Sequence, residues 1–177
     1  FIDAGSDDDV VDAGSGNNTV FGGDGNDEIR SHGGNDLLSG DAGDDLIQAG
    51  GGNDQLNGGA GNDTLLAEAG DDVVNGGDGE DLLDGGAGSD VLAGGTGVDT
   101  YLLYSGMGQD TVTDGADGET NVISIVGGLT ADQVRVGREG DALRVTLRGT
   151  DAALVIGEYG SRPQNWVLRD AAGQETA

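Results

Sequence analysis

The chain of 177 residues contains no cysteine and no lysine, a single proline, and only two phenylalanines, three tyrosines and one tryptophan. Without cysteine, neither a disulfide framework nor a thiolate metal site can form. The scarcity of aromatic side chains removes much of the apolar area that usually stabilises a core. No apolar run approaches the length of a membrane span, and no N-terminal signal peptide is apparent. We therefore expect no membrane-spanning segment.

The residues that are abundant are glycine and acids. The chain has 38 glycines and a formal net charge of −27. Residues 1–102 hold 23 acids and only Arg30 (net −22), whereas residues 103–177 hold 11 acids and six arginines (net −5). Glycine loses the most backbone freedom on folding, so composition alone is typical of a disordered acidic chain. Such a field repels nucleic acid and attracts cations, so no nucleic-acid partner is expected.

A nine-residue frame, G-G-x-G-x-D-x-U-x with U a large apolar residue, repeats through the first part of the chain, as in GGDGNDEIR at residues 22–30. Eleven copies follow without insertion from residue 4 to residue 102, and residues 1–3 fit positions 7–9 of an earlier copy. After Leu103 and Tyr104, a twelfth copy spans Ser105 to Thr113. Position 8 is apolar in every copy: Val11, Val20, Ile29, Leu38, Ile47, Leu56, Leu65, Val74, Leu83, Leu92, Tyr101 and Val112.

The residue types of the frame indicate what each position does. Positions 1–6 predict a turn, because glycine permits left-handed backbone angles and lets carbonyl groups converge. Positions 7–9 predict a short strand whose middle side chain points inward. Nine residues then form half a coil, so turns eighteen residues apart stack on one side. Two stacked turns would share an ion bound by carbonyl groups and two carboxylates, and oxygen ligands at roughly 2.3–2.6 Å suit Ca²⁺.

Over residues 1–113 this frame resembles the repeats-in-toxin (RTX) nonapeptide, which is associated with calcium-binding β-rolls. The resemblance implies an all-β fold: a right-handed parallel β-roll, a β-helix-like solenoid of nonapeptide repeats, followed by a small β-rich C-terminal cap. It also implies the ligands of each ion. The lower turn would give the carbonyl groups of positions 1 and 3 and its aspartate, and the upper turn those of positions 2 and 4 and its own aspartate.

Carried onto this chain, the position-6 residues form two stacks. The first stack consists of Asp9, Asp27, Asp45, Asp63, Asp81 and Asp99, and the second of Asn18, Asp36, Asp54, Asp72, Asp90 and Asp110. Each interior aspartate would bridge two ions, so about eight to ten Ca²⁺ are expected in all. The Asn18/Asp36 site lacks one carboxylate and should be weaker. The Asp90/Asp110 site is doubtful, because Leu103 and Tyr104 lengthen its spacing to twenty.

Backbone carbonyl groups complete the ligand set that the resemblance implies. The remaining metal-site residues are Ala4, Ser6, Gly22, Gly23, Asp24, Gly25, Ser31, Gly33, Gly40, Asp41, Ala42, Gly43, Ala49, Gly50, Gly51, Gly52, Gly58, Gly59, Ala60, Gly61, Ala67, Glu68, Ala69, Gly70, Gly76, Gly77, Asp78, Gly79, Gly85, Gly86, Ala87, Gly88, Gly95, Gly97, Gly106 and Gly108.

Some residues depart from the frame. His32, Asp41 and Glu68 replace glycine at position 2, where only a carbonyl group is required. We interpret His32, the only histidine, as a surface substitution, because a catalytic histidine needs a positioned partner. Asp114 and Asp117 lie in a glycine-rich loop, where they would either assist a terminal calcium or, more simply, form a turn.

Residues 114–177 change character, and five β-branched-rich segments predict strands: Asn121–Val126, Gln133–Val136, Ala142–Leu147, Ala153–Ile156 and Trp166–Leu168. Thr130–Gln133 predicts one helical turn capped by Thr130. An open roll exposes a sheet edge and apolar interior that must be covered. We therefore divide the chain into a repeat roll, 1–113, and a capping segment, 114–177, which also resembles the segment after RTX blocks in secreted toxins.

The resemblance implies a module that folds on Ca²⁺ outside the cell, within a larger protein (toxin, adhesin or hydrolase). A type I secretion apparatus would export that protein through an uncleaved C-terminal signal, for which a place beyond Ala177 is open. As an isolated domain it should be a monomer. The alternative is an adhesive or partner-binding surface at position 7, formed by Leu37, Leu46, Val73, Leu82 and Val91. Catalysis is not expected here, because the aspartates recur in every turn without a unique pocket. Ice binding is rejected, because Thr96 is the only threonine at position 3.

Overall fold

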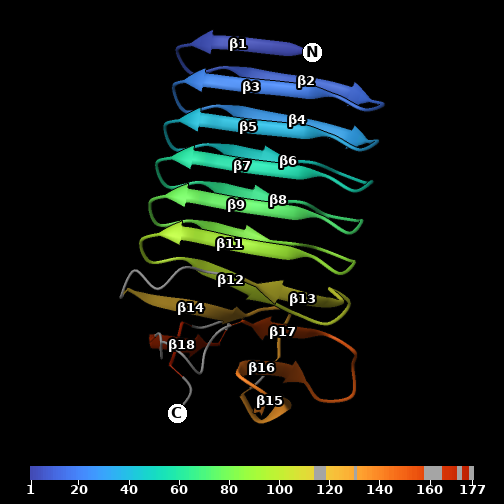
Figure 1. Cartoon of the computed structure of the whole chain (residues 1–177), viewed down its shortest axis with the longest axis vertical. Coiled ribbons are helices and arrows are strands. Elements are labelled where there is room, and N and C mark those ends of the chain that lie inside the picture. The colour runs from blue at the N-terminus through green and yellow to red at the C-terminus, as the bar shows by residue number, and fades with distance from the viewer. Residues whose placement is uncertain (114–118, 130, 158–164, 171–172, 176–177) are drawn as a thin grey trace.

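The computed structural model describes residues 1–113, 119–129, 131–157, 165–170 and 173–175. Two sheets, both parallel throughout the repeats, face each other and wind into a tall solenoid, with the N-terminus at one end and the C-terminal flank at the other (Figure 1). The described residues contain one short 3₁₀ helix, η1 (Ala131–Gln133), and are otherwise strands and turns. The predicted all-β parallel roll of nonapeptide repeats is confirmed.

Consecutive half-coils alternate between the two sheets. The ten-stranded sheet follows the order β1 (Ile2–Ser6), β3 (Thr19–Asp24), β5 (Leu37–Ala42), β7 (Gln55–Ala60), β9 (Val73–Asp78), β11 (Val91–Thr96), β13 (Gln109–Val112), β17 (Ala153–Ile156), β16 (Ala142–Leu147) and β15 (Val134–Glu139). The eight-stranded sheet follows the order β18 (Asn165–Arg169), β14 (Thr120–Ile125), β12 (Thr100–Leu103), β10 (Leu82–Asp84), β8 (Thr64–Leu66), β6 (Leu46–Gln48), β4 (Glu28–Gly33) and β2 (Val10–Ser15).

The core is a double column of position-8 side chains. Pairs such as Val20↔Leu38 and Ile29↔Ile47 lie eighteen residues apart in register, as the frame predicts. From Val20 to Val112 every position-8 residue is at most 2% exposed. Because strands alternate their side-chain direction, one inward residue per strand is enough to fill the narrow interior. This explains how a chain with so few aromatic residues builds a continuous core.

Many strands extend into positions 1–3, including β2 and β4 of the eight-stranded sheet, which corrects the expectation that positions 1–6 all belong to the turn. In the ten-stranded sheet, β3, β5, β7, β9 and β11 run through position 9 into positions 1–3 of the next copy. In the other sheet β6, β8 and β10 end at position 9. Positions 1–3 become strand because they pair with the copy eighteen residues away, as in Gly59↔Gly77.

The C-terminal flank extends both sheets. The predicted strands appear as β14 to β18, two of them with the expected bounds, and the predicted helical turn appears as η1. Its proposed cap, Thr130, is outside the described residues. β17 pairs with β13 and β14 pairs with β12, both parallel, before β16 and β15 turn antiparallel. Trp166 packs on Tyr101 with ring centroids 5.4 Å apart, so an aromatic contact joins flank and roll.

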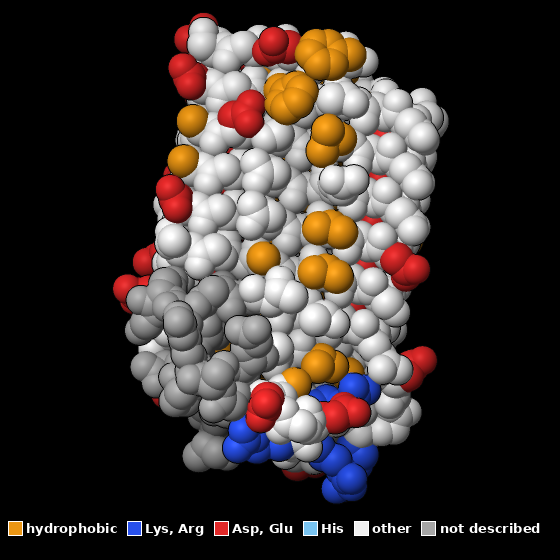
Figure 2. Space-filling view, in the orientation of Figure 1, with side chains coloured by type: hydrophobic (Ala, Val, Ile, Leu, Met, Phe, Trp, Pro, Cys, Tyr) orange, Lys and Arg blue, Asp and Glu red, His pale blue; other side chains and the backbone are white. Residues whose placement is uncertain are grey.

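The surface separates by residue type. In Figure 2 a column of apolar side chains crosses the ten-stranded sheet, where Leu37, Val73 and Val91 are 40%, 49% and 39% exposed. The lower end of the same view carries the blue arginine side chains of the flank. Within the described residues, no helix is long and apolar enough to cross a membrane.

Candidate metal centre

Position-6 aspartates stack directly above one another and link successive turns. In the first stack, the Asp45 amide donates to Asp63 Oδ1 and the Asp63 amide donates to Asp81 Oδ1, both at 2.8 Å. The second stack repeats this pattern, for example from the Asp54 amide to Asp72 Oδ1 at 2.7 Å. The structure therefore forms both predicted stacks. In each stack, one oxygen of every carboxylate after the first residue accepts the amide of the preceding turn.

The second oxygen of these carboxylates has no hydrogen-bond partner although it is buried. These oxygens are the Oδ2 atoms of Asp9, Asp27, Asp45, Asp54, Asp63, Asp72, Asp81, Asp90 and Asp110. A buried carboxylate oxygen without a partner carries a large desolvation cost. A regular row of such atoms is an arrangement that either protons or cations would satisfy.

The gap between the Asp63 and Asp81 turns shows which oxygens converge. Asp63 Oδ2 and Gly76 O both lie against the Cα of Gly58, where a Cβ would overlap the carboxylate and approach Gly76 O to 2.6 Å. The carbonyl oxygens of Gly59 and Gly61 lie against Gly77 and Gly79 of the following turn. Asp78 O reaches back to the Gly61 amide at 2.8 Å. Two carboxylates and four carbonyl groups thus border one gap, and a side chain at Gly58 would overlap the Asp63 carboxylate.

The carbonyl directions differ from the expected arrangement. Positions 2 and 4 of the earlier turn, and positions 1 and 3 of the later turn, face the same gap, as Gly59, Gly61, Gly76 and Asp78 show. The arrangement expected from the sequence had assigned positions 1 and 3 to the lower turn, which is the earlier one in the chain. No group of three or more acidic or histidine side chains gathers in the described part of the chain. Two carboxylates per gap can therefore hold an ion only with the help of these carbonyl groups.

Burial strongly affects the acidity of the stacks. Desolvation raises the pKa of Asp45 and Asp81 to about 6, that of Asp72 to about 7 and that of Asp110 to about 8, with neighbouring aspartates adding to the rise. Amide hydrogen bonds act in the opposite direction but are smaller. Like charges stacked in a partly dry column disfavour ionisation, so these carboxylates require a proton or a cation.

The insertion of Leu103 and Tyr104 does not break the second stack. The Asp90 amide donates to Asp110 Oδ1 at 3.2 Å across a spacing of twenty residues. Leu103 is fully buried, and the Tyr104 hydroxyl donates to Asp84 Oδ1 at 2.9 Å. Leu103 therefore extends strand β12 and joins the core, Tyr104 bonds to the preceding coil, and Asp110 keeps its place in the stack.

Sequence reasoning missed Asn121, which continues the first stack. The Asp99 amide donates to Asn121 Oδ1 at 2.8 Å, and Asn121 is 1% exposed. Its signal was present in NVIS, residues 121–124, which fits positions 6–9 of the frame. The spacing of 22 residues from Asp99 concealed it, because residues of one stack are otherwise eighteen apart.

Position 5 carries a second set of ladders that sequence reasoning did not identify. The Asp44 amide donates to Asn26 Oδ1 at 2.9 Å and the Asn62 amide donates to Asp44 Oδ1 at 2.7 Å. The other side has Asn35 bound to Asn17 at 2.9 Å. These exposed side chains receive the amide of the following turn, whereas position 6 receives that of the preceding turn. Hydrogen bonds therefore tie the turns in both directions without an ion.

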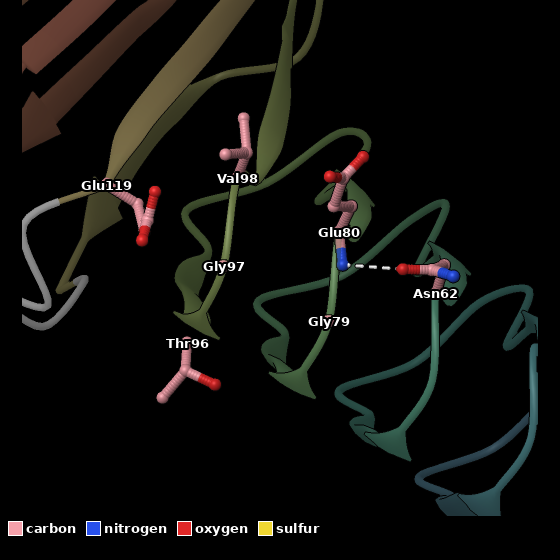
Figure 3. Close-up of a pocket in the computed structure, with 7 residues that line it drawn as sticks. All are labelled: Asn62, Gly79, Glu80, Thr96, Gly97, Val98 and Glu119. Carbon is pink, nitrogen blue, oxygen red and sulfur yellow. Dashed lines mark hydrogen bonds between the residues drawn. The ribbon is translucent and has the colours of Figure 1, made fainter.

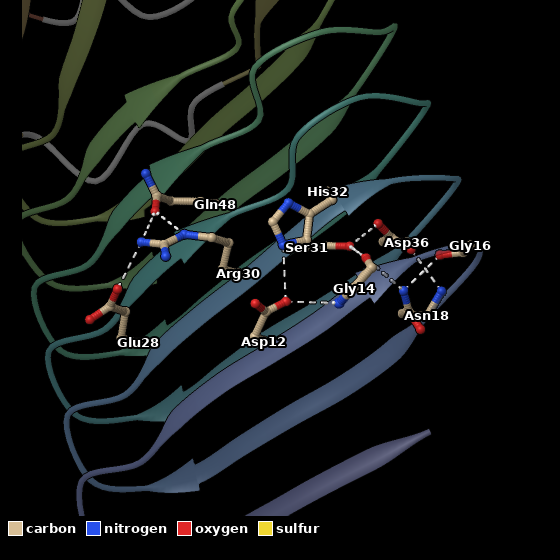
Figure 4. Close-up of polar contacts among 10 residues, drawn as sticks. All are labelled: Asp12, Gly14, Gly16, Asn18, Glu28, Arg30, Ser31, His32, Asp36 and Gln48. Carbon is tan, nitrogen blue, oxygen red and sulfur yellow. Dashed lines mark hydrogen bonds and ion pairs between the residues drawn. The ribbon is translucent and has the colours of Figure 1, made fainter.

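Departures from the frame are accommodated by the backbone. Asp41 and Glu68 adopt φ of 75°, the left-handed angle that glycine otherwise supplies at position 2. His32 is exposed, and its Nε2 lies 3.0 Å from Asp12 Oδ1, as Figure 4 shows. The surface interpretation of His32 is thus confirmed. Asp114 and Asp117 lie outside the described residues.

A surface pocket of about 500 Å³ opens where the position-5 ladder of the first side ends. Figure 3 shows the Glu80 and Glu119 carboxylates beside Val98, with the Glu80 amide donating to Asn62 Oδ1 at 2.8 Å. Its lining comprises turn glycines, a threonine and these acids. The lining does not hold a nucleophile paired with a base, so it does not suggest catalysis.

Comparisons with known proteins point to the same repeats. A family model described as the RTX calcium-binding nonapeptide repeat (4 copies) matches residues 3–38, 30–65 and 66–101, more than half of the chain. No curated protein sequence matches the chain. Among solved structures, the extracellular lipase LipA from Serratia marcescens is similar over 86% of this chain and 36% of that chain, with 17% identity and a TM-score of 0.34. The chain thus spans about a third of that lipase.

Proposed function

Because the chain belongs to the RTX calcium-binding nonapeptide repeat family, we propose that it is a module whose folding is driven by Ca²⁺ bound in the gaps between stacked turns. The observation that carries this proposal is the row of buried, unpaired Oδ2 atoms at position 6. Each gap between two aspartates would take one ion through two carboxylates and four carbonyl groups. Such an all-oxygen ligand set is the one that Ca²⁺ prefers.

The ligands of each ion follow from the carbonyl directions. The earlier turn would supply its aspartate and the carbonyl groups of positions 2 and 4. The later turn would supply its own aspartate and those of positions 1 and 3. Compared with the ligands predicted from the sequence, this set adds the carbonyl groups of Gly5 and Asp7 at the Asp9/Asp27 gap and those of Gly94 and Thr96 at the Asp81/Asp99 gap. It leaves out the carbonyl groups of Ala4, Ser6, Gly95 and Gly97.

Charge neutralisation supplies the mechanism. The gaps between two aspartates number five in the first stack and four in the second, and nine ions would bring +18 against a formal charge of −27. Without cations, repulsion and glycine entropy favour an unfolded chain. With cations, binding free energy becomes folding free energy.

This dependence suits a protein that is exported and folds outside the cell. In a cytosol poor in calcium the chain would stay extended and pass through a type I secretion apparatus, and extracellular calcium would then fold it. We place the roll at residues 1–113 and the cap at residues 114–177, within a larger secreted protein. The module itself would be a non-catalytic monomer.

An adhesive role is the second candidate. Of the predicted position-7 surface, Leu46 and Leu82 lie on the eight-stranded sheet and are only partly exposed. The exposed side chains of Leu37, Val73 and Val91 on the ten-stranded sheet favour the adhesive role, because apolar side chains on a sheet face can contact a partner. To test this role, the calcium-bound module is immobilised and probed with cell-surface extracts. The double substitution Val73→Ser/Val91→Ser should then abolish the binding of extract components.

A calcium titration tests the leading proposal. Circular dichroism should show little β-structure in strong chelator and a cooperative rise with Ca²⁺, while calorimetry reports the number of ions. Mg²⁺ should substitute poorly, because it requires near-octahedral geometry at about 2.0–2.1 Å and retains its waters. A β-rich spectrum in chelator would contradict the proposal, and equal folding in Mg²⁺ would contradict its selectivity.

A further inference from the structure

The first gap of the second stack differs from the others. Asn18 occupies position 6 there, and its Nδ2 donates to Gly16 O at 2.7 Å and to Gly14 O at 3.4 Å (Figure 4). These are the carbonyl groups of positions 4 and 2, the pair that faces the following turn. At the matching place in the first stack, Asp9 presents a buried Oδ2 without a partner. The amide group of Asn18 therefore satisfies the carbonyl groups that a cation would otherwise bind.

A second donor reaches the same gap from the other side. Ser31 is 3% exposed, and its hydroxyl lies 3.3 Å from Gly14 O and 2.5 Å from Asp36 Oδ2. Asp36 is accordingly absent from the row of aspartates with an unpaired Oδ2. Because the hydroxyl has a single hydrogen and Asp36 Oδ2 is the nearer acceptor, Ser31 satisfies the carboxylate oxygen that would otherwise be left without a partner.

The backbone of this gap is also irregular. β2 and β4 pair with a register shift that places Gly14 opposite Ser31, a separation of seventeen residues instead of eighteen. The neighbouring residue, His32, lacks the positive φ that Asp41, Glu68 and the glycines adopt at position 2. The turns on either side of this gap therefore do not repeat the geometry of the cation gaps.

From these observations, and resting on the proposed function, we infer that the gap between the Asn18 and Asp36 turns binds no calcium and is held by hydrogen bonds from Asn18 and Ser31. The amide hydrogens of Asn18 carry partial positive charge and take the place of the ion. With an asparagine, the gap also has one carboxylate fewer to attract a divalent cation. The second stack thus begins with a rung that is independent of calcium.

The test is to count ions in the whole chain by native mass spectrometry at saturating Ca²⁺. Asn18→Asp removes the donor and restores the second carboxylate, so it should bind one ion more than the unchanged chain. Asn17→Asp is the matched control: it adds the same charge one residue away, at an exposed position-5 side chain that accepts the Asn35 amide, and should add none. Asn18→Ala should leave the count unchanged.

Two results would overturn the inference while leaving the proposed function intact: a count in Asn18→Asp equal to that of the unchanged chain, or a count in Asn18→Ala lower by one. A gain in Asn17→Asp equal to that in Asn18→Asp would also overturn it, because charge alone would then explain the extra ion. If the unchanged chain bound no Ca²⁺ at all, the proposed function would fail and this inference with it.

Discussion

An interior position-6 aspartate serves two gaps at once. Asp63 Oδ1 accepts the Asp45 amide of the preceding turn, while its Oδ2 faces the gap shared with Asp81. Asp9, at the first rung of its stack, directs Oδ2 at a single gap shared with Asp27. An aspartate inside a stack therefore faces two gaps, whereas the aspartate at the first rung faces one.

Asp63→Asn should weaken calcium-induced folding more than Asp9→Asn. The first change removes a carboxylate ligand from two ions, and the second from one. At fixed calcium we expect losses on the order of 2–4 and 1–2 kcal/mol, respectively. Equilibrium calcium titrations followed by circular dichroism measure both. Equal shifts of the two midpoints would show that an interior aspartate does not bridge two ions.

Acidification should raise the calcium concentration needed to saturate the gaps between the turns. The pKa values of Asp45, Asp72 and Asp110 in the ion-free roll are raised to about 6, 7 and 8, so these groups hold protons that calcium must displace. Because the folded pKa lies above the ordinary value of 3.8, protonation stabilises the ion-free roll at low pH. This contribution is lost progressively as the pH rises from the ordinary value through the folded values of about 6, 7 and 8. Calcium-binding titrations by calorimetry at pH 8, 7 and 6 should show a rising midpoint of saturation. A midpoint independent of pH would contradict this.

At the scale of the strand and turn, glycine is required at some copies of position 2 and replaceable at others. Gly59 has φ of 121°, and a Cβ there would overlap Asp41 O of the preceding turn. Asp41 itself already carries a side chain at φ of 75°. Whether position 2 can carry a side chain thus depends on its left-handed φ angle and on the distance from its Cβ to the carbonyl oxygen of the stacked turn.

Gly59→Ala should destabilise the calcium-bound roll by roughly 1–3 kcal/mol through backbone strain and the clash with Asp41 O. Asp41→Ala is the matched control in the same stack and should cost less than about 1 kcal/mol, since its Cβ is already accommodated. Thermal unfolding at saturating calcium compares the two. Similar losses would mean that the close approach of stacked turns does not limit position 2.

At the scale of the whole molecule, the flank is continuous with the roll. β14 and β17 add to the two sheets at β12 and β13, and Trp166 covers Tyr101 of the last uninterrupted copy. At the opposite end, β1 and β2 are the edge strands of their sheets. The end next to the flank therefore has more contacts from which folding can begin.

Deleting residues 114–177 should abolish or strongly weaken calcium-induced folding, because it exposes the edges of β12 and β13 and the buried Tyr101 ring. Deleting residues 1–21 is the control, and should cost little beyond the ions that those turns bind. Calcium titrations with circular dichroism and light scattering distinguish the two. If the chain without the flank folds at the same calcium concentration as the full chain, the capping role is wrong.

The sequence by itself determined the periodic part of this protein. A strict nine-residue repeat fixes which side chain points inward and which aspartates share a stack, because both depend only on spacing along the chain. This is why the inward position-8 residues and the eighteen-residue register from Val20 to Leu92 were predictable. Strands in the flank were equally legible from their β-branched residues, since each forms a local pattern.

Tertiary structure decided what depends on contacts between turns. Asp110 keeps its rung at a spacing of twenty, and Asn121 joins at twenty-two, because sheet pairing rather than chain length sets their height. The direction of each carbonyl group follows from the stacked turn that it faces. The amide of Asn18 binds Gly14 and Gly16 because the coil brings those oxygens around it. A repeat specifies a place in the solenoid, but only the folded neighbours determine whether an ion or a hydrogen bond holds it.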